Sequence, residues 1–360
     1  MGKQDFDNYD KSLAEEFASK MFQFLNVGML SLMISIGYKT GLFDILSVLE
    51  PSTSQEIAQE TNLDERYVRE WLGAMVTGKI VKYDSLTRKY NLPKEHSAFL
   101  TRESGVDNLA VFAQYVSLMG NVEDKIVECF RKGGGLPYSE YPKFQQLQAE
   151  ETARIFDSKL TSQILQLNPN IMDRLKKGVK VLDIGCGRGH AVNLMGKAFS
   201  NSKFTGCDIS REGISAAKEE AEKMGLTNVR FEVKDALLIE EIGNFDVITA
   251  FDTIHDQVQP TKVLKAINRS LNKDGLFLMQ DIAASSQVHK NIDALLAPAL
   301  YTISTMHCMS VSLAHNGEGL GTIWGKEMAI KKLTEAGFKD IEVKSIEGDI
   351  INYYYLSRKS

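Results

Sequence analysis

The stretch Val179–His190, which reads Val-Lys-Val-Leu-Asp-Ile-Gly-Cys-Gly-Arg-Gly-His, decides the fold of this chain of 360 residues. Its first half is apolar and predicts a buried strand, and glycines at positions 185, 187 and 189 follow at once. Glycine allows a turn with positive φ, so backbone N–H groups can approach a ligand. The segment 191–199 has apolar positions at helical spacing, and the N-terminus of such a helix attracts an anionic group. The stretch therefore predicts a strand, a ligand-binding turn and a helix.

An acidic residue at the end of the next predicted strand indicates which class of ligand the turn binds. Asp208 closes the strand 203–208 and lies 19 residues after Gly189. This is close to the spacing at which a carboxylate reaches the ribose hydroxyls of a bound nucleoside. The dinucleotide-binding pattern is Gly-x-Gly-x-x-Gly, whereas here single residues separate the three glycines and Asp183 stands two residues before the first. The pattern therefore favours a ligand that contains a single nucleoside over a dinucleotide such as NAD.

The order of these motifs resembles the class I methyltransferases that use S-adenosylmethionine (SAM). The run Asp-Ile-Gly-Cys-Gly-Arg-Gly resembles their motif I, and two further predicted strands follow in the family's order, one that ends with the segment 231–236 and one at 245–251. The resemblance implies SAM as the cofactor, held by the glycine turn and by residues at the strand ends. The expected cofactor-binding residues are Asp183, Gly185, Gly187, Gly189, Asp208, Ile209, Asp235, Ala236 and Phe251.

The same resemblance implies the fold class, which is α/β with a Rossmann-like sheet of seven strands that ends in a reversed hairpin. A fifth strand is expected at 275–281, a helix at 326–336, and the last two strands at 339–346 and 352–358. Residues 282–325 form a long insertion before that helix, and we expect this insertion to act as a substrate lid.

Upstream, the segment from Gly41 to about residue 100 has the pattern of a winged-helix module in a mainly helical N-terminal domain. A capping box at 53–56 predicts one helix, Asp64 caps a second, and residues 80–92 predict two short strands around a polar turn. In DNA readers the second helix carries basic side chains into the major groove, but here acidic and basic residues balance. The module resembles the one that precedes the catalytic domain in many small-molecule O-methyltransferases, where it dimerises. We therefore expect a homodimer and no nucleic-acid partner.

Length and composition fit a protein of more than one domain. We expect a helical and winged-helix dimerisation domain at 1–105, a helical connector and cap at 106–176, and a SAM-binding catalytic domain at 177–360. The formal net charge of −5 gives no reason to expect nucleic acid or an anionic membrane as a partner. The four cysteines are scattered, which is typical of a reduced cytoplasmic protein. Residues 1–7 lack a signal-peptide core, and no uninterrupted apolar run is long enough to span a membrane, so we expect a cytoplasmic location.

The residues that follow the fourth strand are the first candidates for catalysis. In open α/β sheets the ligand lies beyond the carboxyl ends of the strands, which is where His255 and Asp256 stand. Transfer of a methyl group to a hydroxyl or thiol requires that the acceptor lose a proton, and histidine suits that role. The pair resembles the segment of plant-type O-methyltransferases in which this histidine is the general base, although Gln257 replaces the family's usual aromatic residue. His255 and Asp256 are the expected catalytic residues, with helix capping as the alternative for both.

The lid insertion supplies the candidates for substrate contact. The stretch 301–309 predicts one helix that lines a pocket, and the insertion resembles a methyltransferase subfamily found in bacteria and invertebrates. The expected substrate residues are Tyr301, His307, Met309 and Trp324. The histidines at 289, 307 and 315 fit no simple ligand spacing, so we expect no metal.

A second segment is expected to border the substrate. Residues 133–142 combine a glycine run with prolines and tyrosines, which predicts a mobile loop, and loops that join a cap to a catalytic domain often line the substrate site. A passive connector is the alternative.

These observations favour a SAM-dependent methyltransferase that acts on an oxygen or sulfur atom of a small molecule. One rival is a SAM-binding regulator that uses its winged helix on DNA, which would require a basic surface on that module. The other is an NAD-dependent oxidoreductase, which would require the dinucleotide glycine pattern and a catalytic pair such as Tyr-x-x-x-Lys.

Overall fold

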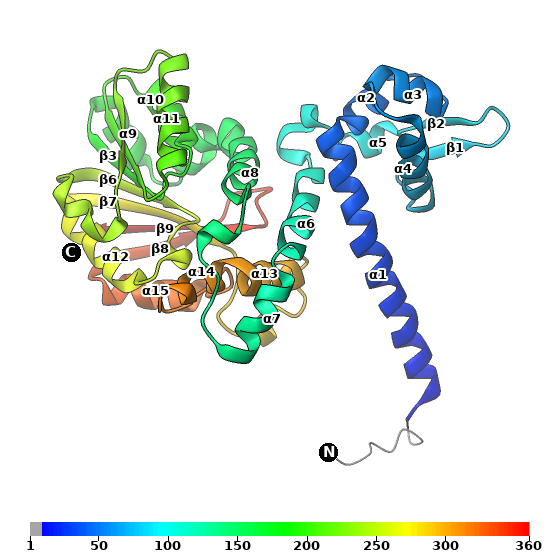
Figure 1. Cartoon of the computed structure of the whole chain (residues 1–360). Coiled ribbons are helices and arrows are strands. Elements are labelled where there is room, and N and C mark those ends of the chain that lie inside the picture. The colour runs from blue at the N-terminus through cyan, green and yellow to red at the C-terminus, as the bar shows by residue number, and fades with distance from the viewer. Residues whose placement is uncertain (1–8, 360) are drawn as a thin grey trace. The chain divides into compact units, whose positions relative to one another are not determined.

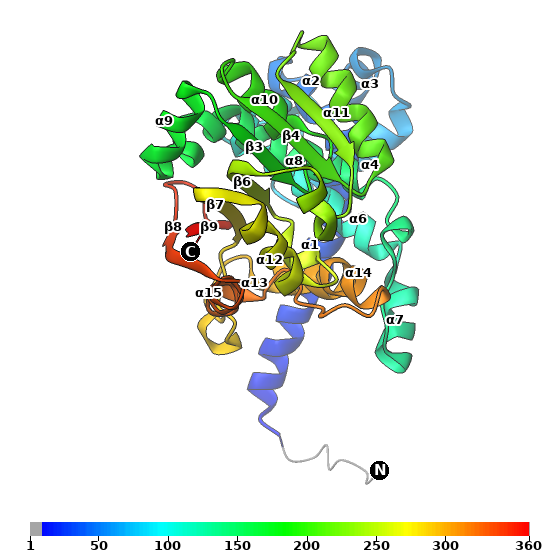
Figure 2. The same cartoon turned by 90° about the vertical axis from the view of Figure 1, so that its left-hand side faces the viewer.

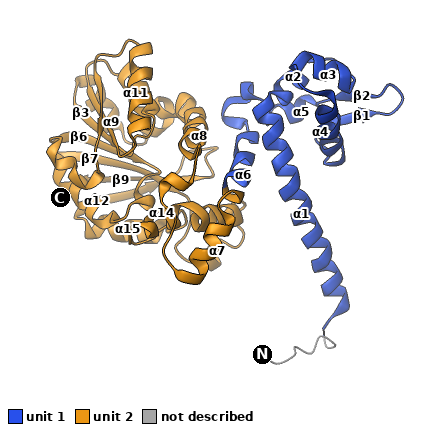
Figure 3. Cartoon of the chain, in the orientation of Figure 1, with its two compact units in different colours: residues 1–118 blue, residues 119–360 orange. Residues whose placement is uncertain are grey.

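The computed structural model describes residues 9–359, and the chain divides into two compact units, one up to Leu118 and one from Met119 onward (Figures 1 and 3). The first unit is mainly helical and the second carries a seven-stranded sheet, so the predicted fold class is confirmed. The expectation that residues 1–7 contain no signal peptide lies outside the described residues. The division at 105/106 and 176/177 stays a prediction.

Unit 1 contains the predicted winged helix. Its elements are α1 (Lys11–Thr40), α2 (Leu42–Val48), α3 (Ser54–Thr61), α4 (Glu65–Thr77), β1 (Lys82–Asp84), β2 (Lys89–Asn91), α5 (Lys94–Ser97) and two 3₁₀ helices (Arg102–Asp107 and Ala110–Ala113), and α6 (Gln114–Gly120) spans the boundary to unit 2. The capping box is present, since Thr53 and Glu56 bond each other's backbone N–H groups at the start of α3. Asp64 caps α4, and β1 pairs antiparallel with β2 to form the wing.

Most of α1 is exposed within unit 1 (Figure 3). Its C-terminal part packs on α4, where the Trp71 indole N–H donates to the Met33 carbonyl at 2.8 Å and a Cβ at Gly37 would lie only 2.5 Å from the Trp71 ring. The exposed large apolar residues of α1 are Leu13, Phe17, Met21, Phe22, Phe24, Leu25, Val27, Met29 and Ile36. By length and composition alone α1 could cross a membrane, a property that the search for uninterrupted apolar runs missed.

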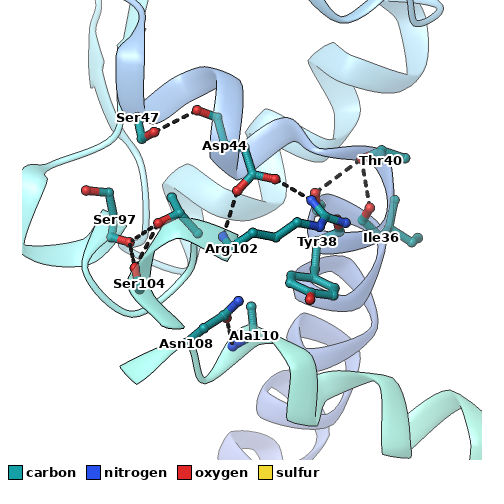
Figure 4. Close-up of polar contacts among 12 residues, drawn as sticks. Ile36, Tyr38, Thr40, Asp44, Ser47, Ser97, Arg102, Ser104, Asn108 and Ala110 are labelled. Carbon is teal, nitrogen blue, oxygen red and sulfur yellow. Dashed lines mark hydrogen bonds and ion pairs between the residues drawn. The ribbon is translucent and has the colours of Figure 1, made fainter. Parts of the chain in front are cut away.

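An arginine closes the C-terminal end of α1 (Figure 4). The Arg102 guanidinium donates to the Tyr38 carbonyl at 2.6 Å, forms an ion pair with Asp44, and lies 4.4 Å from the centre of the Tyr38 ring. The Arg102 backbone N–H also donates to Asp44, at 2.8 Å. The last carbonyls of a helix have no partner within it, so Arg102 satisfies one of them and ties α1 to α2.

Unit 2 is built on the seven-stranded sheet, with helices on both faces (Figure 2). Its strands are β3 (Lys180–Ile184), β4 (Lys203–Asp208), β5 (Val229–Val233), β6 (Phe245–Phe251), β7 (Leu271–Ile282), β8 (Phe338–Lys344) and β9 (Asn352–Lys359). Its α-helices are α7 (Glu123–Lys132), α8 (Phe144–Lys159), α9 (Pro169–Lys177), α10 (His190–Ala198), α11 (Arg211–Lys223), α12 (Pro260–Ser270), α13 (Ala297–Ile303), α14 (Met309–Ala314) and α15 (Gly325–Glu335). The strand order is β5-β4-β3-β6-β7-β9-β8, with the first five strands parallel and β9 antiparallel to both of its neighbours.

The alternation of side chains along the strands produces two cores. Val181 and Phe204 face α8, α9, α10 and α11 on one side of the sheet, whereas Leu182 and Phe277 face α12 and α15 on the other. Strands covered on both faces are apolar nearly throughout, which explains why the sequence predicted them as continuous apolar runs.

The sheet topology positions the candidate site. β3 lies between β4 and β6, and all three are parallel, so the segments that follow them meet at one edge of the sheet. Chain connections leave β3 in opposite directions here, and open α/β sheets bind ligands at such a point.

Two of the differences between the observed and the predicted element bounds exceed a shift of one or two residues. β7 begins at Leu271 rather than at 275, because Leu271 already pairs with Phe245 before an irregularity in the register. The helix expected at 301–309 is part of a longer helical run in which α13 and α14 are joined by a π-helix, Ser304–Cys308. π-helical turns frequently occur at functional sites.

Candidate active site

The glycine turn after β3 has one packed and one open position. Gly185 and Gly187 both have positive φ, of 64° and 52°. A Cβ at Gly185 would lie 2.3 Å from the Thr253 hydroxyl oxygen, whereas a Cβ at Gly187 would meet no heavy atom within 4 Å. Gly185 therefore lets the segment after β6 pack on the turn, whereas the space beside the Cα of Gly187 is open. Gly189, the third expected glycine, is the N-cap of α10.

Asp208 joins the glycine turn to the end of β4. Its carboxylate accepts hydrogen bonds from the N–H groups of Gly187, at 2.9 Å, and Ser210, at 2.8 Å. Burial raises the pKa of Asp208. The Ser210 hydroxyl donates to Gln145 at 2.9 Å, so the first turn of α8 borders this edge of the sheet.

Asp183 lies deeper than the other expected cofactor residues. It is 3% exposed, and it accepts a hydrogen bond from the Thr249 hydroxyl of β6 at 2.6 Å. Burial raises the pKa of Asp183 to about 7. In the described structure it links two central strands, and contact with the cofactor stays a prediction.

The remaining expected cofactor residues lie at or just after the ends of β4, β5 and β6. Ile209 is 71% exposed beside Asp208. Asp235 follows β5, is exposed, and caps a short 3₁₀ helix by accepting from the Leu237 N–H, while Ala236 is buried. Phe251 is half-buried at the end of β6, with its ring 5.0 Å from the ring of Phe156 in α8.

His255 is held by an acid that the sequence analysis did not single out. Its Nδ1 lies 2.8 Å from Asp281 Oδ1, and the Trp324 indole N–H donates to the same oxygen at 2.9 Å. Asp281 is fully buried near the end of β7, and His255 is 4% exposed. This bond leaves His255 Nε2 as the nitrogen that is free of Asp281.

Two carboxylates set the protonation of His255. Burial alone would lower its pKa, but Asp281 and Asp256 raise the pKa well above the ordinary histidine value. Asp256 Oδ1 lies 3.2 Å from His255 Nε2. The buried thiol of Cys308 also lies beside this pair, and burial raises its pKa to about 11.

His307 lies inside a group of aromatic rings. Its ring stacks on Phe144 at a centroid distance of 3.5 Å and meets the edges of Tyr141 and Tyr138 at 4.6 Å and 5.3 Å. Burial lowers the pKa of His307 to about 4, so the ring is neutral near pH 7. Among the described residues, its buried Nε2 has no hydrogen-bond partner. The four side chains Tyr138, Tyr141, Phe144 and His307 are called the aromatic cluster below.

The loop at 133–142 runs against the π-helix. The Leu136 N–H donates to the Ser310 hydroxyl at 2.8 Å, and the Tyr141 hydroxyl donates to the Met306 carbonyl. A Cβ at Gly135 would lie 1.8 Å from the Ser310 carbonyl oxygen, which explains a glycine here. Both the mobility of this loop and its contact with substrate stay predictions.

The other expected substrate residues lie apart from the aromatic cluster. Tyr301 is half-buried and its hydroxyl accepts from the Asn291 amide at 3.2 Å. Met309 is half-buried at the start of α14. Trp324 is 4% exposed and its indole N–H is used by Asp281, so its described role is to position that carboxylate.

Sequence reasoning missed Asp281, Cys308 and Tyr138 as site residues. Asp281 ends the predicted fifth strand, and its position at a carboxyl end was a usable signal. Cys308 gave no signal by spacing, because only the fold brings it to His255.

Both the N-terminal and the C-terminal part of the chain match known protein families. Residues 28–102 match the Rv2258c-like winged HTH domain, and residues 175–337 match a methyltransferase domain. A ubiquinone biosynthesis O-methyltransferase of Actinobacillus pleuropneumoniae is 29% identical over 130 residues, which are 32% of this chain and 53% of that protein. A (S)-tetrahydroprotoberberine N-methyltransferase of Eschscholzia californica is 29% identical over 34% of this chain and 35% of that protein. The chain thus spans about a third to a half of these curated relatives.

Solved structures share the fold over nearly the whole chain. A putative O-methyltransferase of Nostoc punctiforme has a TM-score of 0.74 at 20% identity and covers 95% of this chain and 98% of its own. Human N-acetylserotonin methyltransferase, solved in complex with SAM, has a TM-score of 0.71 at 16% identity and covers 100% of both chains. From these matches and the sheet topology, the chain combines an N-terminal winged-helix domain with a methyltransferase domain, and it shares its fold with SAM-dependent methyltransferases.

Proposed function

We propose that the protein transfers a methyl group from SAM to an oxygen or sulfur atom of a small molecule, with His255 as the general base. The observation that carries this proposal is the contact from His255 Nδ1 to the buried Asp281, which leaves Nε2 as the nitrogen that accepts a proton when the ring is neutral. Because Asp281 and Asp256 raise the pKa of His255, activity should increase as pH rises through that pKa. Thr253, two residues before His255, packs on Gly185, so the base stands on the same short segment that contacts the glycine turn.

The residues at this edge fit SAM. Gly187 offers an open backbone position, and Asp208 offers a carboxylate beside it for the ribose hydroxyls. Ile209 and Asp235 are exposed at the two neighbouring strand ends, where an adenine ring would be held. SAM, when bound, supplies an electrophilic methyl group on a sulfonium.

The protein's own groups would then hold the acceptor and take its proton. Asp281 fixes the His255 ring and stabilises its positive charge once Nε2 has accepted the proton. Tyr138 is half-buried, and its pKa is raised by desolvation and then by the negative charges of Asp256 and Asp208. The aromatic cluster would keep water out and hold the apolar part of the acceptor.

We further propose that the protein acts as a homodimer in the cytoplasm, with unit 1 as the dimerisation domain. The apolar surface of α1 supports a partner there. On α4, the helix that would enter DNA, Arg66 pairs with Glu70 and Arg69 with Glu65, which leaves little positive charge for phosphate.

The experiment that tests the function uses methyl-labelled SAM and a small-metabolite extract, with the wild type and His255→Ala compared. Label in a low-mass product that the variant does not form supports the proposal, and the product's mass identifies the acceptor. His315→Gln is the matched control, since His315 is an exposed histidine of the insertion 282–325. Label that persists in His255→Ala refutes the base, and SAM binding without any labelled product favours a regulator.

A further inference from the structure

Three side chains beside the aromatic cluster have the chemistry of a metal site. One ligand atom each from His255, Asp256 and Cys308 lies within 4.8 Å of the other two. His255 and Cys308 are buried and Asp256 is half-buried, so these are not solvated surface groups. An imidazole, a carboxylate and a thiol are the three ligand types that zinc and similar divalent transition metals accept.

The spacing of the nitrogen and oxygen atoms fits a shared cation. His255 Nε2 and Asp256 Oδ1 are 3.2 Å apart, and tetrahedral bonds of about 2.0–2.1 Å to zinc would separate two ligand atoms by about 3.3 Å. Among the described residues, Asp256 Oδ1 is buried without a hydrogen-bond partner, so the contact with His255 lacks hydrogen-bond geometry. An oxygen left unpaired in this way is costly unless a ligand satisfies it.

The surroundings of the three residues also resemble those of metal sites. A histidine that binds a metal through one nitrogen commonly donates from the other to a carboxylate, as His255 Nδ1 is placed to do with Asp281. Trp324 anchors that carboxylate from behind. The Cys308 sulfur lies 3.6 Å from His307 Nδ1, and a ring N–H at that position could donate to a thiolate.

We propose that His255 Nε2, Asp256 Oδ1 and Cys308 Sγ form a binding site for a divalent transition metal ion such as zinc. Binding displaces the thiol proton of Cys308 and any proton on His255 Nε2, and both pass to solvent. The metal uses the same Nε2 that the proposed general base needs, so a bound ion blocks proton removal. The site thus makes the enzyme sensitive to zinc, and its residues are joined by the fold, not by a ligand-spacing motif in the sequence.

Cobalt(II) is the probe that tests the site without reference to catalysis. We would treat the purified full-length protein with a chelator, remove the chelator, and titrate cobalt(II) under a reducing agent that does not bind metals. The wild type should gain a thiolate-to-cobalt charge-transfer band that saturates at one cobalt per chain. Cys308→Ser should lose this band, whereas Cys129→Ser, in α7, should keep it. A wild type without the band, or a band that survives in Cys308→Ser, overturns the proposal.

A second variant guards against misfolding of Cys308→Ser. Asp256→Asn removes one negative ligand at a half-buried position and should weaken cobalt binding at least tenfold, with the thiolate band retained at saturation. Unchanged cobalt affinity in Asp256→Asn contradicts its role as a ligand. In the labelled-SAM assay, zinc should inhibit the wild type and a chelator should restore it, and insensitivity to bound zinc refutes the block of the base. Because the cobalt spectrum needs no turnover, it tests the metal site independently of the proposed methyl transfer.

Discussion

The cofactor side and the acceptor side of the candidate site are encoded in different ways. On the cofactor side, Gly185, Gly187 and Asp208 come from one strand–turn–helix–strand run, and local hydrogen bonds hold them in place. On the acceptor side, His255 meets Asp281 from the end of another strand and Cys308 from the lid insertion. A site made of neighbouring residues can be found as a motif, whereas a site made by topology becomes visible only in the fold.

The largest effect is expected on the acceptor side. Asp281→Asn keeps the size of the side chain but cannot stabilise the protonated His255 ring in the same way, so kcat should fall by about 10²–10⁴-fold. The dissociation constant of SAM should change little, because Asp281 does not contact the glycine turn or Asp208 in any described hydrogen bond.

The measurement separates kcat from KM and adds SAM binding by calorimetry. Asp293→Asn is the control, since Asp293 is an exposed acid of the insertion that follows β7. A kcat of Asp281→Asn close to that of the wild type would contradict the prediction. Asp281 would then have only a structural role in contact with Trp324 and His255, and it would not orient the proposed base.

The cofactor side can be dissected with three glycine variants. Alanine at positive φ costs about 1–2 kcal/mol, and this cost applies equally to Gly185, Gly187 and Gly225, whose φ values are 64°, 52° and 66°. Gly185→Ala also forces a methyl group against Thr253 and should lose a further 1–3 kcal/mol or so of unfolding free energy. Gly187→Ala and Gly225→Ala have open space and should lose similar, smaller amounts.

SAM affinity then distinguishes the two open glycines. Gly187→Ala should weaken SAM binding at least tenfold, whereas Gly225→Ala, in the turn between α11 and β5, should not. Thermal or urea unfolding gives the stability of each variant and calorimetry gives the dissociation constant. Equal SAM affinity in Gly187→Ala and Gly225→Ala would show that the open face of Gly187 is not where the cofactor lies.

The cofactor side of the site could be predicted from the sequence to a greater extent than the acceptor side. The single strands, the winged helix and the acid at 208 were predicted because apolar periodicity, capping residues and glycine spacing are local. The assembly of the strands into a seven-stranded sheet was expected from the family resemblance. The partner of His255 was not predicted, because Asp281 is 26 residues away and reads as the end of a buried strand. Trp324 was expected to contact substrate, but its indole N–H is used in the core by a carboxylate that no spacing rule links to it.

A smaller effect is expected from the loop that covers the π-helix. Tyr141→Phe removes the hydrogen bond to the Met306 carbonyl and leaves that carbonyl without its described side-chain donor, at a cost of about 1 kcal/mol. We expect a several-fold rise in KM for the acceptor, with SAM affinity unchanged. Tyr67→Phe, on an exposed face of α4, is the control, and an acceptor KM equal to the wild type in both variants would place the loop outside the acceptor site.

The smallest effect on stability is expected at His190, which joins the cofactor motif to helix α8. His190, the last residue of the motif stretch, bonds Glu220 of α11 through Nδ1 at 2.6 Å and Asp157 of α8 through Nε2 at 2.8 Å. The hydrogen bond to Glu220 raises the pKa of His190 above its ordinary 6.5, although burial opposes it.

A raised folded-state pKa gives stability that is complete below the unfolded-state pKa and is lost as pH rises through the folded-state value. The wild type should therefore be more stable than His190→Gln at pH 5.5, by less than about 1 kcal/mol because Asp157 is well exposed, and this advantage should shrink by pH 9. Urea unfolding at the two pH values measures it. An advantage that grows with pH would mean that His190 is held neutral, and that α8, which begins with Phe144 of the aromatic cluster, is attached to the cofactor motif by packing instead of by charge.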